Sequence, residues 1–357
     1  MKGDRMKKRI RIILIVILAI IVLILVAMLF AFRHELKTLS SLEEKSEGVY
    51  TMTYDGDYGF DEFLDTGAKS DADIENYVTK RLMKGLPINI NSADPGCTAF
   101  VTRNEDGDVI YGRNFDFVYA PCLQLFTKPD NGYASVSTVN LSYAGYGKDN
   151  LPTEGISIGN FPVLAAPYLA FDGMNEKGVC MALLSVPEAQ ATDDPDKVTL
   201  NTTTAVRLVL DKAASVDEAV ELLGEYNIYF SGGIASHYLI ADATGKSVIV
   251  EYYDGGLQVV EPDEDYQIAS NFIAHKGLNI GEGFTEFERY DAVEEALQKN
   301  DNVLTMEQCE KLLNKIGIYD GDLDKLQWSV VYDPTDGTGR IWPHRDIDEA
   351  WNFELKQ

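Results

Sequence analysis

The chain has 357 residues, of which 45% are hydrophobic and 25% charged, an ordinary globular balance that allows one large domain or two small ones. Seven of the 31 Lys and Arg residues, but only one of the 57 Asp and Glu residues, lie at or before Arg33, so the chain beyond it carries a net charge of −32. This acidity argues against binding of nucleic acid or of anionic lipid headgroups by the chain beyond Arg33.

An apolar segment near the N-terminus predicts a membrane anchor. Residues 1–11 carry six Lys or Arg residues against one acid, Asp4, and the 21 residues from Ile12 to Phe32 contain no charge. This length is enough to cross a hydrocarbon core of about 30 Å as a helix, and it exceeds the apolar region of about 7–15 residues in a cleaved signal peptide. Because the basic flank is expected to stay in the cytoplasm, we predict a single-pass cell-membrane protein whose later residues are extracellular.

Residues 33–96 are expected to form a stalk and a leader. Residues 34–48 have the composition of a polar stalk, and Val49 to Tyr54 predicts a short strand. Ser70-Asp-Ala-Asp73 is typical of a helix start, and this helix is expected to run to about Lys84, with Gly85 placed to end it.

Residues 94–116 predict a β-hairpin. Cys97 opens a β-prone run, Asn104-Glu-Asp-Gly107 predicts a tight turn, and the return strand delivers Arg113 and Asp116 at its far end. Because a hairpin brings its strand ends together, a thiol, a cation and a carboxylate can share one small site. An adjacent cation lowers the pKa of a thiol and makes it a nucleophile. The alternative is a buried, inert Cys in a surface hairpin.

The rest of the chain predicts strands and helices in alternating groups. Strands are expected at 123–127, 134–143, 168–171, 179–184, 237–241, 247–253, 257–260 and 267–271, with a closing hairpin of 328–332 and 340–342. Helices are expected at 202–213, 219–223, 286–297 and 306–316. This order predicts a layered α+β fold with largely antiparallel sheets.

The cysteines predict neither a metal site nor a disulfide framework. Cys97, Cys122, Cys180 and Cys309 are widely spaced and form no Cys/His cluster, so a zinc site is not expected. For the last three, simple burial is favoured over a disulfide.

The sequence offers two candidates for the general base that would deprotonate the Cys97 thiol. One is His237, in a papain-like arrangement with Asn271 as the orienting residue, although the strand pattern around His237 favours a structural role. The other is the α-amino group of Cys97 itself, whose pKa of about 7.7–8.0 lies near working pH. The second solution requires a chain break before Cys97, and Gly96 has no side chain to hinder attack on its carbonyl.

Five short motifs stand in order along the chain: Gly96-Cys-Thr-Ala-Phe100, Gly112-Arg-Asn-Phe-Asp116, Asn175-Glu-Lys-Gly178, His237-Tyr-Leu-Ile-Ala-Asp242 and Trp328-Ser-Val-Val-Tyr332. Together they resemble the choloylglycine hydrolase family of linear-amide C–N hydrolases, which holds bile salt hydrolases and penicillin V acylases. The resemblance spans roughly Cys97 to Trp342. It implies an N-terminal-nucleophile hydrolase fold, an αββα sandwich of two antiparallel sheets between helical layers.

The resemblance also implies residue roles. Cys97 would be the nucleophile and its own amine the base. Arg113 would lie beside the thiol, and Asp116 would hold the α-amino group. Asn271 would donate its side-chain amide, and Ser185 its backbone N–H, to the oxyanion.

Arg289 matches the second active-site arginine of the family, and two features depart from the family pattern. Ser185 stands where bile salt hydrolases usually have Asn and penicillin V acylases often have Tyr. The resemblance therefore does not identify the acyl group or the amine of the substrate. The leader places 96 residues before the nucleophile. An internal cut between Gly96 and Cys97 is therefore required, as in the self-cleaving acid ceramidase-like relatives.

The sequence thus predicts a membrane-anchored amidase that hydrolyses a linear N-acyl amide through an acyl-cysteine intermediate. Its expected parts are a cytoplasmic flank (1–11), a transmembrane anchor (12–32), the stalk and leader (33–96) and a catalytic domain (97–357). No metal or organic cofactor is implied, and the expected partner is a small-molecule amide. The alternative is a catalytically inactive, membrane-tethered module that binds an acyl amphiphile.

The leader is expected to stay bound to the catalytic chain after the cut. Ile74, Tyr77, Val78 and Leu82 recur at near-helical spacing and predict an apolar stripe on the helix after Ser70. The alternative is a leader that assists folding and is then shed.

Overall fold

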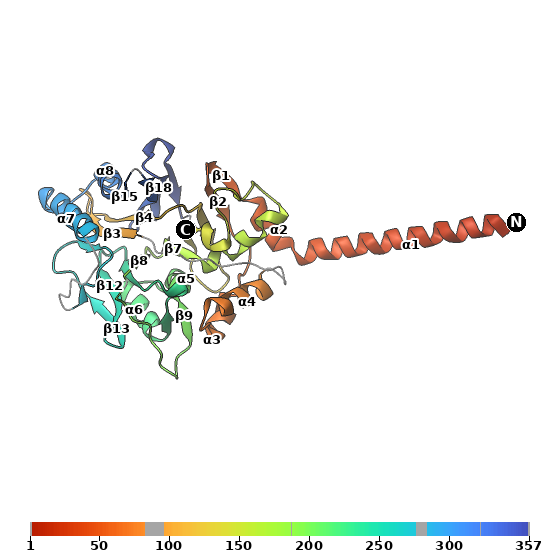
Figure 1. Cartoon of the computed structure of the whole chain (residues 1–357), viewed down its shortest axis with the longest axis horizontal. Coiled ribbons are helices and arrows are strands. Elements are labelled where there is room, and N and C mark those ends of the chain that lie inside the picture. Colours follow the sequence, from red (N-terminus) through yellow and green to blue (C-terminus); the bar gives the residue numbers. More distant parts are fainter. Residues whose placement is uncertain (1, 83–95, 187, 276–283, 322, 356–357) are drawn as a thin grey trace.

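The computed structural model describes residues 2–82, 96–186, 188–275, 284–321 and 323–355, and two β-sheets dominate them (Figure 1). Over these residues the first sheet has nine strands, in the order β1 (Glu43–Ser46), β2 (Val49–Thr53), β5 (Cys122–Thr127), β6 (Ser135–Asn140), β7 (Ala170–Asn175), β8 (Cys180–Ser185), β11 (Ser236–Ala241), β12 (Ser247–Tyr253) and β13 (Gly256–Val260). The second has six, in the order β14 (Gln267–Ala269), β3 (Gly96–Arg103), β4 (Val109–Asp116), β17 (Leu326–Asp333), β18 (Thr338–Pro343) and β19 (Trp351–Glu354).

The strands of both sheets pair antiparallel, except for the parallel pair β2–β5. Two smaller pairs accompany them: β9 (Thr199–Asn201) with β10 (Asn227–Tyr229), and β15 (Tyr319–Asp320) with β16 (Leu323–Asp324). The predicted α+β class with largely antiparallel sheets is confirmed.

Helices cover the outer face of each sheet. The described α-helices are α1 (Lys2–Ala31), α2 (Arg33–Ser40), α3 (Phe60–Thr66), α4 (Asp71–Arg81), α5 (Thr202–Lys212), α6 (Val216–Gly224), α7 (Phe284–Lys299) and α8 (Met306–Ile316). Helix α5 packs on β7 and β8 and α6 on β11 and β12, while α7 packs on β3 and β14 and α8 on β4 and β17. Because β3 also contacts β8 and β11, the two sheets face each other between the helical layers.

Local sequence signals explain several helix starts. Asn201 caps α5 by accepting a hydrogen bond from the backbone N–H of Thr204, whose side chain bonds back to Asn201. Ser70 accepts from the backbone N–H of Asp73 at the start of α4, as its sequence predicts. Helix α4 ends at Arg81 rather than near Lys84, and the proposed terminator Gly85 lies outside the described residues.

The prediction of a polar stalk over residues 34–48 is wrong. This stretch forms α2 and β1, and β1 pairs with β2 at the edge of the nine-stranded sheet. Tyr58 and Phe63 are buried, and the Tyr58 hydroxyl donates to the carboxylate of Asp211 in α5 at 2.7 Å. Residues 33–82 are therefore part of the folded domain, because their apolar side chains complete its core.

Further stretches differ from expectation. The strand predicted over residues 134–143 ends at Asn140, whose side chain accepts the backbone N–H of Ser142 and begins the 3₁₀-helix η1 (Leu141–Ala144). A second 3₁₀-helix, η2 (Ile158–Tyr168), and the last strand, β19, are missing from the sequence-based expectation. Short 3₁₀ turns η3 (Ser231–Gly233) and η5 (Ile347–Glu349) complete the described elements.

Helix α1 extends away from the folded domain (Figure 1). Within the described residues, Arg9–Ala31 is one helix long and apolar enough to cross a membrane, and none of this span is buried against the domain. The anchor remains a prediction from length and composition.

Candidate active site

Strands β3 and β4 form the predicted hairpin and set the geometry of the site. In their register Cys97 faces Phe115, Ala99 faces Arg113, and Gly96 faces Asp116. Because side chains alternate along a strand, Cys97 and Arg113 project toward the nine-stranded sheet and Asp116 projects toward the α7–α8 layer. The three predicted residues are thus brought to one strand end, but they lie on two faces of the sheet.

Arg113 lies beside the Cys97 thiol. Its Nη2 is 3.6 Å from Cys97 Sγ and 3.4 Å from the carbonyl oxygen of Leu183 in the facing sheet. The side chain is wholly buried, and its Nε is 2.9 Å from a carboxylate oxygen of Asp172, which is also wholly buried. A buried guanidinium needs such a partner, because an unpaired charge is costly to bury.

Asp172 is a site residue that the sequence analysis missed. Its two oxygens also accept from the Tyr332 hydroxyl at 2.6 Å and from the Trp328 indole N–H at 3.3 Å. The strand predicted over residues 168–171 stops before Asp172, whereas β7 continues to Asn175 and Asp172 is wholly buried. Two sequence motifs could have pointed to Asp172. The motif at 175–178 follows it closely in the chain, and the motif at 328–332 contains its two hydrogen-bond donors, Trp328 and Tyr332.

Two stacked aromatic rings lie beside the Arg113 guanidinium. Its Cζ lies 4.9 Å from the centre of the Phe115 ring and 5.5 Å from that of Trp328, and these rings stack with 4.0 Å between centroids. Cation–π attraction and the Asp172 ion pair together hold the guanidinium against the thiol.

The thiol is not activated in the intact chain. Burial raises the pKa of Cys97 to about 11, and the Asp116 charge adds to this, while Arg113, Arg289 and a hydrogen bond from the Ser185 backbone N–H oppose it. Cys97 is wholly buried, so the intact chain holds a protonated and covered thiol.

Arg289 and Asn271 gather around the backbone of Cys97, although both are distant in sequence. Asn271 Oδ1 accepts from the Cys97 backbone N–H at 2.9 Å and from Arg289 Nη2 at 2.8 Å. Arg289 Nη1 donates to the Cys97 carbonyl oxygen and to the Thr98 hydroxyl. Asn271 Nδ2 donates to the carbonyl oxygen of Ser185 at 2.7 Å, so one of its two N–H bonds is occupied in the intact chain.

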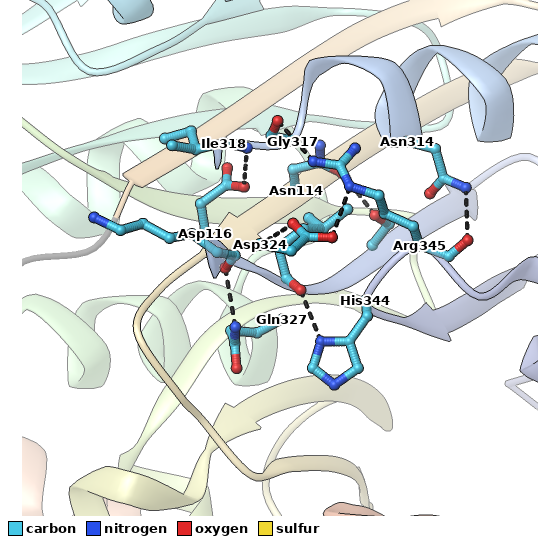
Figure 2. Close-up of polar contacts among 12 residues, drawn as sticks. Asn114, Asp116, Asn314, Gly317, Ile318, Asp324, Gln327, His344 and Arg345 are labelled. Carbon is cyan, nitrogen blue, oxygen red and sulfur yellow. Dashed lines mark hydrogen bonds and ion pairs between the residues drawn. The ribbon is translucent and has the colours of Figure 1, made fainter. Parts of the chain in front are cut away.

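Asp116 lies beside the Gly96–Cys97 junction, under the segment that follows α8. Its Oδ1 accepts the backbone N–H of Ile318 at 2.7 Å (Figure 2), while its buried Oδ2 has no hydrogen-bond partner among the described residues. Burial raises the pKa of Asp116 to about 6 against the charges of Arg289 and Arg113. This carboxyl therefore has an oxygen available for a new cation.

The segment over Asp116 is fixed by Arg345, as Figure 2 shows. Arg345 donates to the carboxylate of Asp324 at 2.7 Å and to the carbonyl oxygen of Gly317 at 2.8 Å. A Cβ added at Gly96 would lie 2.5 Å from Ile318 Cδ1, so a larger residue there would require the end of the Ile318 side chain to shift.

Among the described residues, the papain-like arrangement with Asn271 as the orienting residue of His237 is not formed. His237 Nδ1 pairs with Glu251 at 3.0 Å, whereas the contacts of Asn271 are with Cys97, Arg289 and Ser185. Glu251 also accepts the backbone N–H groups of Ala274 and His275, so this buried pair supports the loop that follows Asn271. The structural role expected for His237 is the one observed.

All four cysteines are free and buried. The burial expected for Cys122, Cys180 and Cys309 is thus confirmed.

Comparison with known proteins agrees with the motifs. The family of linear amide C–N hydrolases of the choloylglycine hydrolase type matches residues 97–308, and the chain belongs to this family. A bile salt hydrolase/transferase of Clostridium perfringens is 29% identical over 204 residues, which cover 52% of this chain and 59% of that protein. A penicillin V acylase of Pectobacterium atrosepticum is 32% identical over 111 residues, 28% of this chain and 29% of that protein.

A solved structure supports the fold. A mutant of the conjugated bile acid hydrolase from Clostridium perfringens superposes with a TM-score of 0.53 at 20% identity, covering 72% of this chain and 92% of that chain. At this identity the likeness concerns the fold. The family assignment made from the five sequence motifs is confirmed.

Proposed function

We propose that this protein hydrolyses a linear N-acyl amide through an acyl-cysteine intermediate on Cys97. The observation that carries the proposal is the buried Arg113 guanidinium, 3.6 Å from the thiol and fixed by Asp172, in a member of a linear amide hydrolase family. A fixed cation stabilises a thiolate, and a pre-positioned cation needs no reorganisation during the reaction.

The enzyme becomes active by a cut between Gly96 and Cys97. In the intact chain the Cys97 nitrogen is an amide that donates to Asn271, so it cannot act as a base. Attack of Cys97 Sγ on the Gly96 carbonyl carbon forms a C–S bond and breaks the C–N bond, and the proton of the thiol passes to the released nitrogen. Water then hydrolyses the thioester, which leaves a Gly96 carboxylate and a free α-amino group on Cys97.

Asp116 supports the proposed new N-terminus. It faces Gly96 across the hairpin and has a buried oxygen without a hydrogen-bond partner among the described residues. An α-ammonium beside it would supply the missing donor and stabilise the ionised carboxylate.

The proposed catalytic cycle uses the freed amine as the base. It takes the proton of the thiol, and the thiolate attacks the acyl carbon of the substrate. The oxyanion is stabilised by the Ser185 backbone N–H, which bonds the thiol in the intact chain, and by the second N–H of Asn271. The α-ammonium protonates the leaving amine, and water hydrolyses the acyl-cysteine.

The proposed topology is a single-pass anchor at residues 12–32 with the catalytic domain outside the cell. Support comes from the exposed apolar helix and from the basic residues that precede it. Residues 33–96 are proposed to stay with the catalytic chain after the cut, because β2 pairs with β5 and Tyr58 bonds Asp211.

The test is an activity panel of N-acyl amino acids, conjugated bile salts and phenoxyacetyl amides. We expect hydrolysis of at least one class, and a loss of at least about 100-fold in Cys97→Ser, since a hydroxyl is a far weaker nucleophile than a thiolate. Cys309→Ser, which alters another buried free cysteine, is the matched control and is expected to keep activity.

Two other results would contradict the proposed enzyme. Equal rates in Cys97→Ser and the parent protein would exclude Cys97 as the nucleophile. A chain with a free, alkylatable Cys97 N-terminus that hydrolyses no amide of the panel would favour the inactive binding module.

A further inference from the structure

An exposed apolar segment lies outside the catalytic site. Ile158 is 85% exposed and Ile156 is 57% exposed, and Ile158 has the highest exposure among the large hydrophobic residues described as exposed. We name Ile156, Ile158 and the half-buried Phe161 the juxtamembrane patch.

The patch lies next to the end of helix α1. Residues 155–161 run beside α2, since the Gly155 backbone N–H donates to the Leu42 carbonyl at 3.0 Å and the Phe161 ring meets the Phe32 ring edge-on at 6.2 Å. Phe32 is the last residue of the apolar run that begins at Ile12. Figure 1 shows α1 leaving the domain beside α2 and this segment.

The segment is held in a defined conformation. Asn160 is buried, its Oδ1 accepts the Thr153 backbone N–H, and its Nδ2 donates to the carbonyl oxygens of Thr153 and Gly155. Ser157 accepts the backbone N–H of Gly159 at the start of η2. The exposure of Ile156 and Ile158 is therefore a built feature of the fold.

We propose that the juxtamembrane patch inserts into the lipid bilayer beside the anchor and seats the catalytic domain on the membrane surface. This inference rests on the membrane topology in the proposed function. Apolar side chains at the level of the headgroup–acyl boundary leave water on insertion. The nearby Glu154 and the net charge of −32 beyond Arg33 disfavour attraction to anionic headgroups, so the contact is apolar and suits zwitterionic lipid.

The consequence is a fixed orientation of the domain. Helix α1 alone, which ends at Ala31, gives a single point of attachment, whereas α1 and the patch together give two. A domain held in this way presents the same face to the bilayer at all times, which favours amide substrates that themselves lie in the membrane.

The test uses fluorescence quenching by lipid. Ile158→Cys is introduced into the full chain in a Cys97→Ala background and labelled with nitrobenzoxadiazole, because Cys122, Cys180 and Cys309 are buried. The protein is reconstituted in phosphatidylcholine vesicles with or without nitroxide-labelled phosphatidylcholine. We expect most of the emission at position 158 to be lost when the nitroxide lipid is present.

Two matched positions control the measurement. Val259→Cys alters another exposed apolar residue, on β13, and is expected to keep its emission. The patch lies near β1, since the Glu44 backbone N–H in β1 donates to the Glu154 carboxylate at 3.3 Å. Strands β1 and β13 are at opposite edges of the nine-stranded sheet, eight strand spacings or roughly 38 Å apart along the sheet. Leu23→Cys lies within the anchor and is expected to be quenched.

Each outcome decides between two ideas. Quenching at positions 23 and 158 but not 259 supports the patch. Quenching at position 23 with positions 158 and 259 both unquenched overturns the patch and leaves the anchor standing. Lack of quenching at position 23 overturns the anchor in the proposed function and the patch with it.

Discussion

Replacing Arg113 by Lys tests the geometry of the activated thiol. Arg113 places one nitrogen 3.6 Å from Cys97 Sγ and another 2.9 Å from Asp172. A Lys ammonium is a single point charge and cannot keep both contacts. If it stays with Asp172 at about 6 Å from the sulfur, its attraction to the thiolate falls from about 4.6 to about 2.8 kcal/mol at an effective dielectric constant of about 20.

This loss corresponds to a rise of about 1.3 in the thiol pKa and a fall on the order of 20-fold in the thiolate fraction. The assay is the rate of iodoacetamide alkylation of Cys97 against pH in the cut enzyme, together with kcat/KM for the best amide of the panel. We expect the alkylation profile to shift to higher pH and kcat/KM to fall in parallel.

Arg207→Lys is the control for destabilisation. Arg207 is also wholly buried and is paired with Asp211 at 3.3 Å, but its hydrogen bonds go to Thr127 and Ser135 rather than to the site. Its replacement is expected to lower the melting temperature without moving the Cys97 profile. An Arg113→Lys enzyme whose alkylation profile and kcat/KM match those of the parent would refute the reasoning.

Three further predictions concern the cut before Cys97, the ionisation of Asp116 and the location of the cut fragment. Cys97→Ala is expected to remain full-length on gel electrophoresis, and a cut product in that variant would place the cleavage chemistry elsewhere. In that uncut background the Asp116 carboxyl binds its proton more tightly in the folded than in the unfolded chain, because burial raises its pKa to about 6. The free energy of unfolding should therefore fall by roughly 3 kcal/mol as pH rises from about 3 to 7. Chemical denaturation at several pH values should show this fall, and its persistence in Asp116→Asn would contradict the assignment. Cell fractionation should find the fragment beginning at Cys97 in the membrane with residues 1–96, and its recovery mainly from the medium would show that the leader is shed.

The hairpin that carries the site was predictable because its signals are local. The β-prone run after Cys97, the turn at Asn104–Gly107 and the return strand fix the register within 20 residues, and this register places Arg113 near the thiol. Helix α4, which has the capping residue Ser70 at its start, was predictable for the same reason.

Contacts between distant segments were not predictable from periodicity or spacing. Asn271 and Arg289 meet Cys97 across 174 and 192 residues of sequence, and only the family resemblance selected them. Asp172 was missed because a carboxylate near a turn motif is typical of a solvent-exposed loop. Its burial depends on Arg113, Trp328 and Tyr332, which come from two other strands.

The error over residues 34–48 has a similar origin. Polar composition predicted a stalk, but edge strands are stabilised largely by backbone pairing and need few apolar residues. Strand β1 is exposed along most of its length and still pairs with β2. The sequence of such a strand carries little signal of its own, since the partner supplies the stabilisation.

The central claim is that Cys97, as the new N-terminus, carries the acyl group of the substrate. Intact-mass spectrometry of an active preparation, acid-quenched during turnover of a phenoxyacetyl amide, tests it directly. The account predicts a chain of residues 97–357 together with the same chain increased by the mass of the acyl group, and no adduct in Cys97→Ser. An active preparation that contains only the full-length chain would contradict the account.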